Sequence, residues 1–394
     1  MIGFTKLICG TEEIGDELRY GRDSSKLPSH LLQFSTDKKP IVVWNSTRQC
    51  NLSCIHCYIE ASPGRGVDEL STEEARRMID DLAEFGVPVL LFSGGEPLLR
   101  KDLYELGDYA VSKGLRTVIS TNGVLITEET AKRIKASGFS YVGVSLDGME
   151  ETNDCFRGKK GAFRDALTAI RNCREAGVKV GLRFTINRHN YHDLERIFEL
   201  LKTEQIPRCC FYHLVYAGRG SSMVGEDVSL DESRAAAELI YEKTKEFCRD
   251  GVSCELLTVD NHTDGVFLYL KMREENPERA EKVLELLRWN GGNNSGIAIA
   301  CVGPTGEVHP DQFWRHHSFG NVRERRFGEI WTDIGDPLMA GLKDRKHLLT
   351  GRCGSCKFLD ICNGNFRVRA EAVYGDIWAP DPACYLTDEE IGSA

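Results

Sequence analysis

The sequence predicts an α/β protein, a partial (β/α)6 TIM-like barrel followed by a small, loop-rich C-terminal domain. Between residues 40 and 215, apolar runs of strand length alternate six times with helical patterns, which is typical of a parallel sheet. Polar motifs follow directly after several of these runs, at the strand ends where such folds bind ligands. Cysteines gather in two groups, one after the first strand and one near the C-terminus.

The expected strands and helices follow one another in the order that right-handed crossovers require. The first strand is expected at 41–46, and the next helix begins with Ser71 as its N-cap and Glu74 as its capping-box partner. Gly86 is the expected end of that helix. The remaining strands are expected at 87–93, 115–121, 141–146, 179–186 and 208–215, and the helices between them at about 102–113, 127–137, 162–176 and 191–203.

Beyond the barrel the pattern changes. A longer helix is expected at 228–250 and a charged helix at 267–289, and the glycine-rich loop 291–296 indicates a boundary. The expected domains are an N-terminal extension (1–38), the core barrel (39–225), a helical connector (226–296) and a cysteine-rich domain (297–394).

Composition excludes some classes of function. The chain has 394 residues, 41% of them hydrophobic, and a net charge of −10, which argues against a general nucleic-acid-binding protein. The apolar run that begins at Val87 is too short to cross a membrane. The N-terminus does not resemble a signal peptide, so the expected location is the cytoplasm.

Fifteen cysteines are many for a cytoplasmic chain, where clustered thiols more often mean metal or redox chemistry than disulfides. Cys50, Cys54 and Cys57 have C-x3-C-x2-C spacing, and three thiolates would leave one iron of a 4Fe-4S cubane free for another ligand. Zinc with His56 as fourth ligand is the alternative. The second group, Cys353, Cys356, Cys362 and Cys384, offers a closed set of four thiolates for a cluster or for zinc. Most of the other cysteines are expected to be small buried side chains.

The first cysteine group, together with the motifs SGGEP (93–97), STNG (120–123) and SLDG (145–148), resembles the signature of radical S-adenosyl-L-methionine (SAM) enzymes. The resemblance covers residues 38–215 and implies that Cys50, Cys54 and Cys57 hold a 4Fe-4S cluster whose open iron binds SAM, with His56 as a spacer. It also implies a 5′-deoxyadenosyl radical that abstracts hydrogen from the substrate. The implied SAM-binding residues are Tyr58, Gly94, Gly95, Glu96, Ser120, Asn122, Ser145, Asp147 and Arg183.

The second cysteine group resembles the SPASM-type C-terminal extension of the same superfamily, which carries auxiliary 4Fe-4S clusters. Cys301 and Gly306 match the start of the full two-cluster pattern, but Asp311 and Phe366 stand where further cysteines would be. The resemblance therefore implies one auxiliary cluster and two 4Fe-4S clusters in all. Cys301 is left as a packed or substrate-facing thiol.

The stretch HPDQFWRHH (309–317) concentrates histidine, arginine and tryptophan, which suits a flat, anionic, iron-bearing ligand. It resembles the tetrapyrrole branch of SPASM-type enzymes, and most closely the deacetylases that convert 12,18-didecarboxysiroheme to Fe-coproporphyrin III in siroheme-dependent heme biosynthesis. The implied substrate-binding residues are His309, Asp311, Arg315, His316, His317 and Cys301. A reductant such as ferredoxin or flavodoxin is the implied partner, with no nucleic acid and no membrane.

Three alternatives stay open at this point. A heme d1 maturase or a heme synthase would act on related tetrapyrroles. A SPASM peptide maturase would act on a peptide, and often keeps both auxiliary clusters. A non-enzymatic iron–sulfur electron carrier would not need the three polar motifs at the strand ends.

Overall fold

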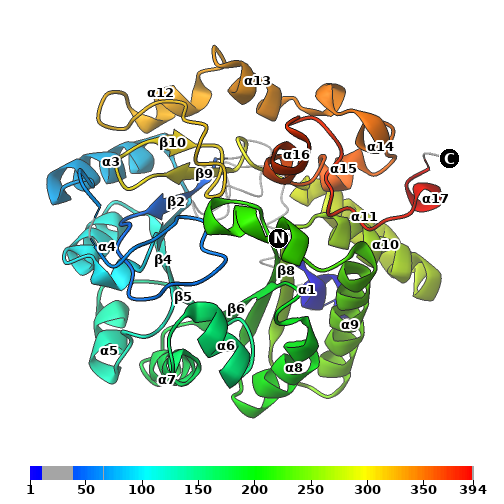
Figure 1. Ribbon diagram of the computed structural model, residues 1–394, viewed down its shortest axis with the longest axis horizontal. Helices are drawn as coiled ribbons and strands as arrows, with labels where there is room; N and C mark the ends of the chain where they lie inside the picture. Colours follow the sequence, from blue (N-terminus) through cyan, green and yellow to red (C-terminus); the bar gives the residue numbers. More distant parts are fainter. Residues whose placement is uncertain (11–38, 65, 393–394) are drawn as a thin grey trace.

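The computed structural model describes residues 1–10, 39–64 and 66–392, built around one ten-stranded sheet (Figure 1). Strands β2 to β8 are parallel and lie side by side in chain order, and β9 adds a further parallel strand beside β2. β1 and β10 are antiparallel edge strands, so the described sheet is an open, partial barrel. The strands are β1 (Ile2–Gly3), β2 (Ile41–Asn45), β3 (Val89–Ser93), β4 (Arg116–Thr121), β5 (Tyr141–Ser145), β6 (Val180–Ile186), β7 (Arg208–His213), β8 (Glu255–Val259), β9 (Ile299–Val302) and β10 (Val308–His309).

The α/β fold class and the six parallel strands, β2 to β7, are confirmed. These strands are continuous apolar runs rather than alternating ones, because a parallel sheet is covered on both faces. Figure 1 shows helices α3, α5, α7 and α8 on the outside of the strands. The inner side of the barrel is thereby left for the cavity described below.

The helices of the barrel agree closely with the expected ranges. In α3 (Thr72–Phe85) the Ser71 side chain accepts from the Glu74 backbone N–H, the Glu74 side chain accepts from the Ser71 N–H, and Gly86 ends the helix in a left-handed conformation. The others are α4 (Leu103–Ser112), α5 (Glu128–Ala136), α6 (Glu150–Arg157), α7 (Ala162–Glu175) and α8 (Leu194–Thr203), with 3₁₀ turns at Pro97–Leu99, Tyr191–Asp193 and Gly218–Glu226. The short α6 was not predicted.

Residues 226–296 contain more than the expected helices. α9 (Leu230–Arg249) matches the expected helix, but the five residues of β8 follow it and pair with β7. The expected single helix 267–289 is wrong, since α10 (Thr263–Glu275) and α11 (Pro277–Asn290) are separate helices. Pro277 cannot continue α10, and it starts α11 behind Asn276, whose side chain caps the Arg279 N–H.

The first ten residues pack on the far edge of the sheet. β1 pairs with β8, and α1 (Phe4–Cys9) packs against β8 and α9. Cys9 and Cys248 form a disulfide with a Cα–Cα distance of 6.4 Å, so for these two residues the expectation of free, packed thiols is wrong. The rest of the expected N-terminal extension, residues 11–38, lies outside the described residues.

The C-terminal part is loop-rich, as expected, and its helices are short. They are α12 (Phe327–Thr332), α13 (Pro337–Lys343), α14 (Gly351–Gly354), α15 (Leu359–Cys362), α16 (Arg367–Tyr374) and α17 (Asp388–Ile391), with a 3₁₀ turn at Lys346–Leu348. The domain boundaries themselves remain a prediction.

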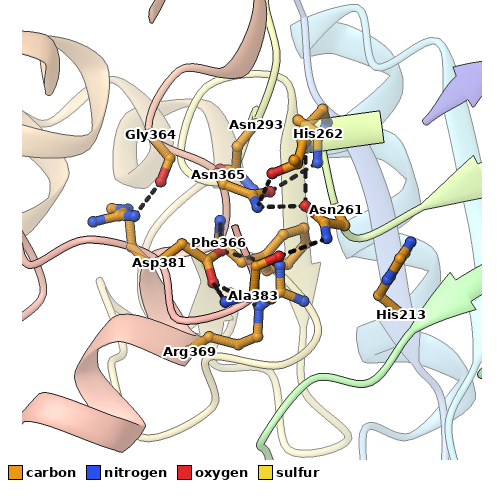
Figure 2. A network of polar contacts seen from close by, with 12 residues as sticks. His213, Asn261, His262, Asn293, Gly364, Asn365, Phe366, Arg369, Asp381 and Ala383 are labelled. Carbon is orange, nitrogen blue, oxygen red and sulfur yellow. Dashed lines mark hydrogen bonds and ion pairs between the residues drawn. The ribbon is translucent and has the colours of Figure 1, made fainter. Parts of the chain in front are cut away.

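A buried polar network joins this part to the barrel (Figure 2). The Asn365 side chain donates to Asn261 Oδ1 at 2.6 Å and accepts from the His262 N–H at 2.8 Å, in the loop after β8. Arg369 and Asp381, both fully buried, form an ion pair at 3.0 Å. These buried contacts hold the C-terminal part in one position on the barrel.

Candidate functional site

A cavity lies at the carboxyl ends of strands β2 to β8, where the sequence predicted the site. Its volume is about 1110 Å³, including the part that is open to solvent. Its lining residues come from the loop after β2, from each strand end in turn, and from two residues of the C-terminal part. They are Val43, Cys50, Leu52, Cys54, His56, Cys57, Tyr58, Leu91, Ser93, Gly94, Gly95, Ser120, Thr121, Asn122, Ser145, Arg157, Arg183, Thr185, Tyr212, His213, Leu214, Val215, Arg219, Asp260, Gln312 and Phe313.

The three cysteines of the loop after β2 all face this cavity. The loop is fixed by Arg219, whose guanidinium donates to the carbonyl oxygens of Cys54 and Ala61, both at 2.9 Å. Burial raises the pKa of the Cys50 thiol to about 11, and it also raises the pKa of Cys54. The three thiols line one cavity, and the two buried ones, Cys50 and Cys54, become thiolates only beside a positive charge, so the donor set fits a metal cluster.

His56, between the second and third cysteines, is held in place by other contacts. Its ring stacks on Phe156 with centroids 4.6 Å apart, and its Nε2 lies 3.5 Å from Asp147 Oδ2. Burial lowers the pKa of His56 to about 4, so the ring is neutral at physiological pH. Its expected role as a spacer remains a prediction.

Gly94 and Gly95 are required by a close approach of two backbone segments. Gly94 has a φ of +130°, and a Cβ on Gly95 would lie 2.2 Å from the Gln49 carbonyl oxygen. The Gly95 N–H donates to the Thr47 carbonyl at 2.8 Å, which fixes the turn after β3 against the cysteine loop. The two glycines therefore position the cysteine loop besides lining the cavity.

Glu96 does not line the cavity. It is fully buried, and its carboxylate accepts from Thr121 Oγ1 and from the Asn122 N–H, both at 2.8 Å. Burial raises the pKa of Glu96 to about 7. It thereby holds the STNG turn against the turn after β3, and its expected contact with SAM stays a prediction.

Asp147 is also buried away from the cavity, at 0% exposure. One of its oxygens accepts from the Thr185 N–H at 2.7 Å, and the other pairs with Arg157 on α6. Arg157 lines the cavity and donates to Cys54 Sγ at 3.6 Å. Asp147 thus acts on the site through Arg157, a residue that the sequence analysis missed.

The other residues expected to bind SAM do line the cavity. Arg183 donates to Ser120 Oγ at 2.6 Å and lies over the Tyr212 ring, 4.7 Å from its centroid. The Tyr58 hydroxyl donates to Asn45 Oδ1 at 2.9 Å. The structure therefore brings together Tyr58, Gly94, Gly95, Ser120, Asn122, Ser145 and Arg183 around one space, beside the three cysteines.

The second cysteine group surrounds a smaller pocket of the C-terminal part. Cys353, Cys356, Cys362 and Cys384 all line it, with Thr263 from the start of α10. Burial and then the neighbouring thiols raise the pKa of Cys362 well above its usual value. Four thiols around one pocket fit a group that supplies positive charge, and an iron–sulfur cluster suits them better than a single zinc ion, because among the described residues no three of these sulfur atoms lie within 4.8 Å of one another.

The residues expected to bind substrate are not brought together at the cavity. Asp311 accepts from the backbone N–H groups of Phe313 and Trp314, at 2.8 and 3.0 Å, so it shapes a turn. That turn places Gln312 and Phe313, which were not predicted, in the cavity wall.

The remaining candidates have other partners. His316 and His317 both contact Glu371, at 2.8 and 2.9 Å, and His309 Nδ1 contacts the His317 carbonyl at 2.7 Å. Cys301 is fully buried and accepts from Asn45 at 3.3 Å. Arg315 donates to the Tyr58 carbonyl at 3.4 Å.

Three further cavity residues come from the ends of β7 and β8. Tyr212 and His213 end β7, and Asp260 follows β8 with a φ of +67°, a backbone conformation that is uncommon for residues other than glycine. The strand-end rule that pointed to the earlier motifs also applies to Tyr212 and His213. Asp260 could not be found in this way, since β8 itself was not predicted.

Comparisons with known proteins agree on one family. Residues 44–201 match the radical SAM superfamily. Over 395 residues the chain is 66% identical to the Fe-coproporphyrin III synthase of Methanosarcina barkeri (strain Fusaro / DSM 804), covering 100% of this chain and 99% of that protein. It is 41% identical over 360 residues to the pre-heme d1 synthase of Dinoroseobacter shibae, covering 90% and 88%. SuiB of Streptococcus suis, bound to its precursor peptide SuiA, shares the fold alone, with a TM-score of 0.70 and 18% identity over 89% of this chain and 76% of that one.

Proposed function

We propose a function from one premise: the chain belongs to the radical SAM superfamily. The protein is an enzyme that uses a 4Fe-4S cluster and SAM, and we infer that it removes the two acetate side chains of 12,18-didecarboxysiroheme to give Fe-coproporphyrin III. The observation that carries this proposal is the 66% identity, over the full length of both chains, to an Fe-coproporphyrin III synthase. The cavity with three converging thiols at the strand ends supports it.

In this proposal Cys50, Cys54 and Cys57 would hold the cluster, which would leave one iron open for SAM and would supply the one-electron chemistry that makes a 5′-deoxyadenosyl radical from it. The chain's own residues orient SAM and shield it from water. Those proposed to contact SAM are Tyr58, Gly94, Gly95, Ser120, Asn122, Ser145 and Arg183, while Glu96 and Asp147 position their neighbours.

A second, auxiliary 4Fe-4S cluster is proposed on Cys353, Cys356, Cys362 and Cys384. The four converging thiols support it, and the SPASM-type resemblance of this region favours a cluster over zinc. All four ligands would be protein thiolates, so this cluster would have no open iron for SAM.

The proposed partners are an iron tetrapyrrole and a low-potential reductant such as ferredoxin or flavodoxin. The cytoplasm is the proposed location. Among the described residues, no helix has both the length and the apolar character needed to cross a membrane.

A second candidate is the maturation of heme d1, favoured by the 41% identity to a pre-heme d1 synthase over 90% of this chain. Heme d1 maturation and the deacetylation proposed above differ in the tetrapyrrole product that the enzyme would release. The electron-carrier alternative is set aside because the protein is an enzyme.

The test is anaerobic incubation of the reconstituted protein with dithionite, SAM and 12,18-didecarboxysiroheme, followed by mass analysis of both products. The expected result is 5′-deoxyadenosine together with a tetrapyrrole that has lost two acetate groups. Cys54→Ala should produce neither, whereas Cys155→Ala is the matched control, since Cys155 is an exposed thiol on α6. Vinyl groups on the product, or no 5′-deoxyadenosine from the wild type, would overturn the proposal.

A further inference from the structure

Two histidines line the main cavity, His56 and His213. The ring of His56 stacks on Phe156, and its Nε2 lies 3.5 Å from Asp147, while its Nδ1 is buried without a hydrogen-bond partner among the described residues. His213 ends β7, and its Nε2 has a carboxylate at the shorter distance of 2.9 Å.

That carboxylate belongs to Asp264 in the first turn of α10. His213 Nε2 lies 2.9 Å from Asp264 Oδ2, and the Tyr385 hydroxyl donates to Asp264 Oδ1 at 2.7 Å. Asp264 has 0% exposure, and the other two residues are also buried. Figure 2 shows His213 beside the polar network that joins the C-terminal part to the barrel.

The contacts of Asp264 assign the tautomer of His213. A carboxylate only accepts hydrogen bonds, so Nε2 of His213 carries a proton and donates it to Asp264. In a neutral imidazole the other nitrogen, Nδ1, then has a free lone pair. Among residues 1–10, 39–64 and 66–392 the structure has no hydrogen bond to Nδ1 of His213.

An imidazole with a carboxylate on one nitrogen and a free lone pair on the other is the usual arrangement of a metal-binding histidine. The carboxylate fixes the ring and raises the basicity of the ligating nitrogen. Imidazole is also a common axial ligand of tetrapyrrole iron. The proposed substrate contains such an iron.

We infer that His213, backed by Asp264, is an axial ligand of the iron of the tetrapyrrole substrate. This inference rests on the proposed function. β7 is separated from β2 by four strands, so the macrocycle would lie on the far side of the cavity from the cysteine loop, with the SAM-binding residues between them. Leu214, Val215 and Phe313 line the same cavity and offer apolar contacts to a flat ring.

This assignment replaces the histidines that the sequence suggested. His316 and His317 face Glu371 and do not line the cavity, and His309 is buried against a backbone carbonyl. The number of histidines in a stretch therefore does not identify the ligand.

The test uses binding without turnover. Reconstituted protein without SAM is titrated anaerobically with 12,18-didecarboxysiroheme, and the absorption and electron paramagnetic resonance spectra of the bound iron are recorded. Wild type should give a spectrum typical of imidazole ligation, and His213→Ala should lose it and regain it when free imidazole is added. Asp264→Asn should keep the ligation but weaken tetrapyrrole binding by about 10-fold. Replacing a residue that hydrogen-bonds to a metal-binding histidine typically weakens binding by about 10- to 100-fold.

His347→Ala is the matched control, because His347 is an exposed histidine beside an aspartate, Asp344, at 3.6 Å. It should leave the spectrum unchanged, and so should His316→Ala. The circular dichroism spectrum and the iron–sulfur content of His213→Ala, compared with those of the wild type, verify its fold. An unchanged iron spectrum in His213→Ala, or a changed one in His316→Ala, overturns the inference alone. Failure of the wild type to bind any iron tetrapyrrole overturns the proposed function and this inference with it.

Discussion

Replacing Gly95 by alanine tests how the turn after β3 supports the cysteine loop. The new Cβ would lie 2.2 Å from the Gln49 carbonyl oxygen, and contacts under 3.0 Å do not occur, so the two segments must separate by at least about 0.8 Å. The colliding atom belongs to the backbone, so no side chain can rotate away.

The separation strains two hydrogen bonds, from the Gly95 N–H to Thr47 and from the Glu96 N–H to Gln49, both at 2.8 Å. Overpacking of this kind costs about 1 to 3 kcal/mol and each of the two hydrogen bonds about 1 kcal/mol, so the expected loss of stability is about 3 to 5 kcal/mol. Gln49 precedes Cys50, and a shift of about 0.8 Å exceeds the roughly 0.2 Å that metal–ligand distances tolerate.

We therefore expect Gly95→Ala to lose the cluster on Cys50, Cys54 and Cys57 and to cleave SAM at least about 100-fold more slowly. Iron content, 5′-deoxyadenosine yield and Tm measure the three effects. Gly225→Ala is the matched control, since its Cβ would meet nothing within 4 Å. A Gly95→Ala protein with wild-type iron content and SAM cleavage would refute the argument.

Other changes have equally direct outcomes. Cys54→Ala should abolish SAM cleavage, whereas Cys356→Ala should lower the iron content from about eight to about four per chain and retain some cleavage; equal loss of cleavage in both would contradict separate roles. Asp147→Asn leaves the buried Arg157 without its ion pair and should lower stability by about 3 to 5 kcal/mol, measured by Tm; no change would show that the pair is not needed. Cys9→Ser should lower stability by about 5 kcal/mol under oxidising conditions and leave it unchanged in dithiothreitol, since the disulfide closes a loop with a sequence separation of 239; equal unfolding curves in both conditions would argue against the bond.

The alternation of apolar runs and helical patterns predicted β2 to β7. A parallel strand is covered on both faces, so nearly all of its residues are apolar and the run stands out in the sequence. The same reasoning missed β8, whose five residues stand among long charged helices and form a strand by pairing with β7 and β1, which lie far away in the chain. It also joined α10 and α11, although Pro277 already indicated the break.

Strand-end motifs predicted much of the cavity, but not which side chains point into it. Glu96 and Asp147 belong to expected motifs yet turn into the protein, Glu96 toward the STNG turn and Asp147 toward Arg157. Arg157 comes from α6, a helix that the sequence patterns did not indicate. Such choices depend on packing between segments far apart in the chain, which local patterns do not encode.

The histidine-rich stretch was the weakest basis for a prediction. Residue types alone suggested a ligand site, while the turn capped by Asp311 points Gln312 and Phe313 into the cavity and leaves the histidines outside. His213 has a carboxylate partner 51 residues away, at Asp264. Only the folded arrangement brings the two together.

The central claim is that this enzyme removes acetate groups from an iron tetrapyrrole. The most direct measurement uses 12,18-didecarboxysiroheme that carries carbon-13 in both acetate side chains, incubated anaerobically with reduced protein and SAM. The account predicts that Fe-coproporphyrin III accumulates with neither labelled acetate group. A tetrapyrrole that keeps both labels while 5′-deoxyadenosine accumulates would contradict it.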